Sequence, residues 1–227
     1  MTKPRPYMLG GKETGHYQSA FNKALLIFKE LDPEEMAARS GAAYDPRTCL
    51  FTLPSFGQNI TIQYPRGLVT FTSSELPLLG WRLVVLNYLV RSDGISMDNR
   101  LISYRELENG TVFYNAFQRE SILTLGQWVQ DKSPCILAQA MIRLGAAVTS
   151  KDADLAATLL ALPRFPITIK IWFPDDELPG SANILFDSSA NHYLHTEDIA
   201  VLGDYASAFL INEYQVLTGR PCRPITL

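Results

Sequence analysis

Residues 171–219 read IWFPDDELPGSANILFDSSANHYLHTEDIAVLGDYASAFLINEYQVLTG, and they hold eight Asp or Glu residues but no Lys or Arg. A strand predicted over 167–173 leads into this stretch, and a long helix predicted over 197–217 occupies its end. Between them, Thr196 is the expected helix N-cap, with two acidic residues in the first turn after it. The stretch therefore joins a strand to a helix and concentrates negative charge between them.

The rest of the chain contains runs of strands and runs of helices rather than a regular alternation. Short segments rich in β-branched and aromatic residues predict an antiparallel meander over 48–53, 59–64 and 67–71. Later strands are expected over 101–107 and 182–186. Apolar spacing and capping residues predict helices over 17–31, 33–40, 76–91, 113–130 and 134–144. The alanine and leucine content of 154–162 favours a helix, but the prolines that follow limit it.

This order of elements predicts an α+β fold. Its antiparallel sheet is built from the N-terminal meander plus later strands and packs against several helices. No long linker divides the 227 residues, so we expect one globular α+β domain over 16–227. The polar, glycine-containing start predicts a flexible N-terminal tail over 1–15.

Composition limits the class of protein. The chain is 47% hydrophobic and 19% charged, which is typical of a globular protein. Its start lacks the apolar run of a signal peptide, and no segment reaches the roughly 18 apolar residues that a membrane span requires. We therefore expect a soluble, cytoplasmic protein that does not bind membranes. The net charge of −3 argues against a nucleic-acid partner.

Local signatures of large enzyme classes are missing from the sequence. It has no glycine-rich dinucleotide or phosphate loop, no serine-hydrolase elbow, no HExxH and no CxxC. The three cysteines are scattered and form neither a disulfide framework nor a zinc motif. The sequence therefore assigns no catalytic residue and leaves open whether the protein is an enzyme.

Two groups of side chains in the acidic stretch are candidate metal ligands. Adjacent carboxylates at the end of a predicted strand suit a hard cation such as Ca²⁺ or Mg²⁺, although a solvated turn explains them more simply: Asp175, Asp176 and Glu177. A second group matches the two histidines and one carboxylate that zinc or ferrous iron accepts: Asp187, His192 and His195. In the simpler alternative, one histidine is hydrogen-bonded near the helix start and the other is exposed.

A third group mixes aromatic rings with arginine. Such a mixture suits a mostly apolar pocket with a few polar contacts for an anionic or conjugated ligand. Alternatively, the rings belong to the core and the arginines extend outward. We expect the pocket between the sheet, residues 104–119 and the helix entrance at 192–198. Its predicted ligand-binding residues are Tyr104, Arg105, Tyr114, Arg119, Trp172 and His192.

Several blocks of the chain together resemble a bacterial and archaeal family, domain of unknown function 3786. The blocks are LVVLNYLVRSDG (83–94), ISYRELENG (102–110), LPRFPI (162–167), WFPDDELP (172–179) and ANILFDSSANHYLHTEDIAVL (182–202). The resemblance covers roughly residues 16–210. Two positions depart from the family pattern: Pro174 replaces a glycine in the acidic loop, and His195 replaces a proline before the helix. The second departure weakens a metal site that needs both histidines.

The resemblance implies a compact domain found often in anaerobes, alongside metal-, iron–sulfur- or corrinoid-dependent metabolism. It supplies no activity and no catalytic residues. Our leading hypothesis is a small-ligand or cofactor-binding accessory protein, with a haem-like tetrapyrrole or a corrinoid as the possible cofactor. One alternative is a metal-dependent hydrolase that uses Asp187, His192 and His195 as ligands for a divalent metal. Another is an interaction module whose acidic face binds a basic protein partner.

Overall fold

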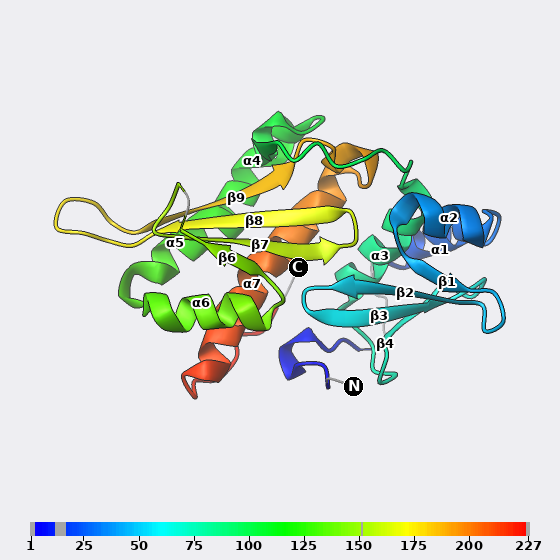
Figure 1. The fold of residues 1–227 in the computed structure, drawn as a ribbon, viewed down its shortest axis with the longest axis horizontal. Helices are drawn as coiled ribbons and strands as arrows, with labels where there is room; N and C mark the ends of the chain where they lie inside the picture. Colours follow the sequence, from blue (N-terminus) through cyan, green and yellow to red (C-terminus); the bar gives the residue numbers. More distant parts are fainter. Residues whose placement is uncertain (1–2, 12–16, 151, 226–227) are drawn as a thin grey trace.

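The structure is a computed structural model that describes residues 3–11, 17–150 and 152–225. Its strands form two antiparallel sheets (Figure 1). The first has the order β1-β2-β3-β4 and consists of Ala43–Asp45, Leu50–Ser55, Gln58–Gln63 and Leu68–Phe71. The second has the order β5-β9-β8-β7-β6 and consists, in the same order, of Leu101–Ser103, Ser181–Asp187, Phe165–Trp172, Leu155–Leu162 and Ala147–Thr149. These pairings confirm the α+β class and the N-terminal meander, while the later strands form a sheet of their own.

The segment 154–162, for which the sequence favoured a helix, contains strand β7 instead. It pairs with β6 on one side and with β8 on the other. Most of its side chains are buried, so its small alanines are packed on both faces of the sheet. Tertiary packing therefore outweighs the helix propensity of alanine and leucine here.

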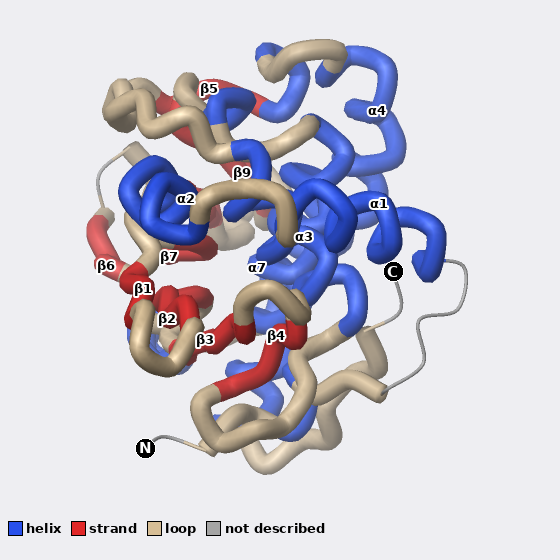
Figure 2. Tube along the Cα trace, turned by 90° about the vertical axis from the view of Figure 1, so that its right-hand side faces the viewer, coloured by secondary structure: helices blue, strands red, loops and turns tan. Residues whose placement is uncertain are grey.

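The helices confirm most of the predicted helical segments. They are α1 (Gln18–Phe28), α2 (Pro33–Ser40), α3 (Leu79–Arg91), α4 (Gly110–Phe117), α5 (Thr124–Trp128), α6 (Pro134–Arg143) and α7 (Thr196–Leu217). In Figure 1, α7 and the segment from α4 to α5 cross behind the five-stranded sheet. In the view turned by 90°, α1 lies beside α3 (Figure 2). No helix in the described part of the chain combines the length and apolar character needed to cross a bilayer.

The two sheets meet where β2 ends against β7. The backbone N–H of Phe56 donates to the carbonyl of Leu160 at 2.9 Å, and the Ser55 hydroxyl donates to the carbonyl of Ala161. The indole of Trp81, in α3, donates to the same Ser55 hydroxyl at 2.9 Å. Rings of Phe56, Trp81 and Phe209 pack together at this junction. Helices α3 and α7 are therefore fixed against both sheets through one aromatic cluster.

The helix predicted over 113–130 is interrupted. Between α4 and α5 the chain forms a π-helix, Gln118–Leu123, which contains one wider turn. The buried Ser121 of this turn donates its hydroxyl to Asp204 of α7. Apolar spacing predicts helical character but not its pitch, because the wider turn depends on contacts with another helix.

The N-terminal segment differs from the predicted flexible tail. Residues 3–11 include a short 3-10 helix, Pro6–Met8, and both Tyr7 and Met8 are buried. Leu9 forms an isolated bridge with Pro77, and Tyr7 donates to the carboxylate of Glu213 in α7. The remainder of the predicted tail, residues 1–2 and 12–15, lies outside the described residues.

Candidate functional site

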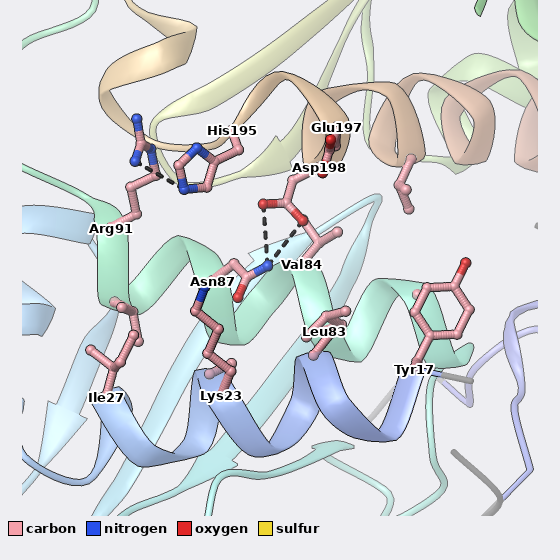
Figure 3. A pocket seen from close by; sticks show the side chains of 15 residues that line it. Tyr17, Lys23, Ile27, Leu83, Val84, Asn87, Arg91, His195, Glu197 and Asp198 are labelled. Atoms are coloured by element: carbon pink, nitrogen blue, oxygen red, sulfur yellow. Dashed lines mark hydrogen bonds between the residues drawn. The ribbon is translucent and has the colours of Figure 1, made fainter. Parts of the chain in front are cut away.

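A groove of about 710 Å³ opens between α1, α3 and α7. Figure 3 shows α3 between the other two helices, with side chains from all three directed into the space. The apolar part of its lining includes Ile27 of α1, Leu83 and Val84 of α3, and Val201 of α7. Because α1 and α7 each pack on α3, the space between them is a product of helix packing and not of a loop.

The first turn of α7 brings a carboxylate into this groove. Asn87 of α3 donates its side-chain amide to both carboxylate oxygens of Asp198, at 3.0 and 3.2 Å. Burial raises the pKa of Asp198 to about 6, although the Asn87 hydrogen bond opposes that shift. The groove therefore holds a carboxyl group that exchanges its proton near neutral pH.

Besides the Asn87–Asp198 pair, the groove has a second pair of polar side chains, Arg91 and His195 (Figure 3). Arg91 Nη1 lies 3.1 Å from His195 Nε2, and since a guanidinium can only donate, the imidazole nitrogen accepts. Burial and the nearby Arg91 charge lower the pKa of His195. His195 is therefore a neutral hydrogen-bond acceptor at neutral pH.

Two further hollows adjoin the groove at Arg91. One, of about 440 Å³, is lined by Arg91, Asp93, Glu108, Asn191 and His192. The other, of about 390 Å³, shares Lys23, Arg91, His195 and Glu197 with the groove. Arg91 thus stands at the junction of three hollows.

The predicted metal ligands of the helix entrance have separate partners. Asp187 is buried, and its Oδ1 accepts from the backbone N–H groups of Asp98 and Ser189 and from the Ser189 hydroxyl. Burial raises the pKa of Asp187, but these hydrogen bonds outweigh burial and hold the pKa below its ordinary value. His192 Nδ1 lies 2.7 Å from Asp93 Oδ2, while His195 contacts Arg91. Within 3–11, 17–150 and 152–225, no three His, Cys, Asp or Glu side chains are grouped to hold a metal ion.

The acidic loop that follows β8 is exposed and organises its own turn. The carboxylate of Asp175 accepts from the backbone N–H groups of Glu177 and Leu178 at 2.9 and 2.7 Å. These hydrogen bonds lower the pKa of Asp175. Asp176 and Glu177 are also exposed, which agrees with the solvated-turn alternative. A basic partner for this loop stays a prediction.

The predicted ligand-binding residues are not assembled into one pocket. Tyr104 is fully buried, stacks on Phe117 at 4.3 Å and donates to the carbonyl of Thr196. Arg105 lies 4.1 Å from the ring centre of Tyr114, whereas the exposed Arg119 pairs with Glu120. Trp172 is partly buried at the end of β8, and only His192 borders a hollow next to the groove. The core-and-surface alternative therefore describes residues 104–119.

Sequence reasoning found one side of the groove and missed the others. His195 and the acidic first turn of α7 belong to the stretch identified at the outset, although α7 begins at Thr196 with His195 in the capping position. The polar residues contributed by α1 and α3 were missed: Lys23, Asn87 and Arg91. One signal was available, because Asn87 and Arg91 are four residues apart and so share one face of a mostly apolar helix.

Fold and groove together define an α+β protein with a ligand-sized groove on its helical side. A family model described as Domain of unknown function (DUF3786) matches residues 32–208. The chain belongs to this family, as the sequence blocks suggest. The matched range contains α3 and the first turns of α7 but not α1. Neither the curated proteins nor the solved structures yield a match to this chain.

Proposed function

We propose that this protein binds a small molecule in the groove between α1, α3 and α7. The observation that carries the proposal is the groove itself: about 710 Å³ of space with an apolar lining and a few polar side chains at defined places. Sites for small molecules in proteins have this size, and they combine apolar surface with a small number of polar contacts.

The lining indicates what kind of molecule fits. Ile27, Leu83 and Val84 offer apolar surface to the groove. Asp198, held by Asn87, offers an acceptor when ionised and a donor when protonated. A ligand with an apolar body and a polar group at its end satisfies both parts of the lining.

A tetrapyrrole or corrinoid is the specific ligand that we propose to test first. Such molecules have a large conjugated or apolar body with polar side chains, which agrees with the lining of the groove. The family resemblance supports this choice because it points to corrinoid- and metal-dependent metabolism. The proposal assigns the protein a binding or accessory role.

A bulky side chain at Ala20 is expected to weaken binding in the groove. Ala20 is an exposed residue of α1 that lines the groove, so Ala20→Trp fills the space without disturbing the core. We expect the neutral fluorescent probe N-phenyl-1-naphthylamine to bind the natural protein saturably, and Ala20→Trp to weaken it by about tenfold or more. Ala116→Trp, at an exposed alanine of α4, serves as the matched control and should bind normally.

Absorption titrations with haem and with cobalamin then test the specific ligand. A saturable spectral change that Ala20→Trp removes and Ala116→Trp keeps supports the tetrapyrrole proposal. If the neutral probe binds and neither cofactor does, the tetrapyrrole proposal is wrong and the groove proposal stands. Binding of the probe that survives Ala20→Trp would rule out the groove.

A further inference from the structure

We infer that the Arg91 end of the groove binds an anionic oxygen group of the ligand, a carboxylate or a phosphate, through Arg91, Lys23 and His195. This inference rests on the proposed function and names the chemical class of its ligand. Three sets of observations support it: the unused donors of Arg91, the position of Lys23 and the state of His195.

Arg91 has donors that the protein does not use. Its Nη2 donates to the carbonyl of Asn191 at 3.4 Å and its Nη1 to His195, but its Nε is buried without a hydrogen-bond partner. Among the residues that the structure describes, no carboxylate forms an ion pair with it. A buried, unsatisfied donor of a charged group is costly. The planar guanidinium matches the two oxygens of a carboxylate or phosphate, which can accept from the second N–H groups of Nη1 and Nη2.

Lys23 adds a second positive charge from the opposite wall. It lies on α1, lines the groove and the adjoining hollow together with Arg91, and is exposed. Figure 3 shows its side chain rising from α1 toward α3, on the same side as Asn87. In the described chain Lys23 also has no ion pair with a carboxylate. An anion at Arg91 therefore meets cations from two helices.

His195 links binding to proton uptake. An anion on Arg91 offsets the guanidinium charge that disfavours the imidazolium form, and it accepts a hydrogen bond from that form. The charged or titratable groups that face this histidine come from four elements: Arg91 of α3, Lys23 of α1, Glu197 and Asp198 of α7, and Glu108 before α4. The acidic members favour the charged form, and a bound anion adds to their effect and so raises the pKa of His195. Binding of the anion should therefore tighten as pH falls.

The test compares two probes that differ by one anionic group. 8-Anilinonaphthalene-1-sulfonate carries the same ring system as N-phenyl-1-naphthylamine plus a sulfonate. We expect the sulfonate probe to bind the natural protein about tenfold more tightly than the neutral probe. Arg91→Gln should remove this advantage by weakening the sulfonate probe far more than the neutral probe, whereas Arg119→Gln, at an exposed arginine outside the groove, should keep it.

Further variants cover folding and pH. Lys23→Gln changes an exposed side chain, so we expect this variant to fold, and it replaces Arg91→Gln in the test if that variant does not. It should reduce the tighter binding of the sulfonate probe, relative to the neutral probe, about threefold. The advantage should grow between pH 8 and pH 5.5 at constant ionic strength. His195→Gln should reduce that growth, and the remaining part should come from protonation of Asp198, whose pKa is about 6 in the same groove. Displacement of the sulfonate probe by inorganic phosphate or by acetate then identifies the preferred oxygen group.

Several results would overturn the inference. Equal affinities of the two probes would show that no anion is recognised, while binding of the neutral probe would leave the groove itself intact. If the sulfonate probe still binds more tightly than the neutral probe to both Arg91→Gln and Lys23→Gln, the anion binds elsewhere. The same conclusion follows if neither phosphate nor acetate displaces the sulfonate probe. If the natural protein binds neither probe, the proposed function itself is rejected.

Discussion

Glu213→Gln is expected to lower the free energy of unfolding by about 3 kcal/mol, because it removes the buried charge to which two arginines and a tyrosine hydroxyl are bound. Glu213 has 0% of its side chain exposed. Its Oε2 accepts from Tyr7 at 2.5 Å and lies 2.6 Å from Arg5 Nε, and its Oε1 lies 2.6 Å from Arg143 Nε. The carboxylate therefore joins α7 to the N-terminal segment and to the end of α6. Burial and the hydrogen bond to Glu213 raise the pKa of Tyr7, so its hydroxyl stays protonated as the donor.

Urea unfolding measures this effect, and Arg143→Gln provides the comparison. The Arg143 side chain is 40% exposed, so its loss should cost only about 1 kcal/mol, as for partly solvated ion pairs. Tyr7→Phe should cost about 1 kcal/mol for one hydrogen bond. If Glu213→Gln is no more destabilising than Arg143→Gln, the three partners do not depend on this carboxylate.

Asp198→Asn is expected to have the opposite sign and to stabilise the protein by about 2 kcal/mol at pH 7.5. In the folded protein, burial raises the pKa of Asp198 from 3.8 to about 6. The folded state therefore binds the proton more tightly than the unfolded state, and stability falls as pH rises from about 4 to about 6. Above that range the full cost of a poorly solvated carboxylate is present. A neutral amide removes the cost and can still exchange hydrogen bonds with Asn87.

The pH dependence separates Asp198 from a second carboxyl with the same tendency. Burial also raises the pKa of Asp204 to about 6, so the natural protein should lose stability through the same range at both sites. Unfolding measured from pH 4 to pH 7.5 should show about half of that loss in Asp198→Asn. An Asp198→Asn protein that is less stable than the natural one at pH 7.5 would contradict the assigned environment of this carboxyl.

Local sequence rules predicted those parts of the fold that local contacts determine. Helix α2 is an example: Asp32 accepts from the backbone N–H groups of Glu34 and Glu35, and Gly41 ends the helix in the left-handed conformation. The π-helix Gln118–Leu123 and the docked N-terminal segment escaped prediction because each depends on a contact with α7. Contacts of that kind have no periodicity in the sequence.

The groove was predictable only in part for the same reason. The acidic stretch directed attention to His195, and one of its acids, Asp198, proved to lie beside it in the groove. The partners of these residues, Asn87 and Arg91, come from a helix more than 100 residues earlier in the chain. The residue types Asp187, His192 and His195 suggested a metal site, but their order in one segment does not show that the fold gives each of them a different partner.

The proposed ligand site is the groove between α1, α3 and α7. The most direct test is a ¹H–¹⁵N NMR titration of the natural protein with 8-anilinonaphthalene-1-sulfonate. The largest chemical-shift changes are expected at the backbone amides of Lys23, Asn87, Arg91 and His195. Largest changes in the exposed loop at Asp175–Glu177, or around Tyr104 and Arg119, would contradict it.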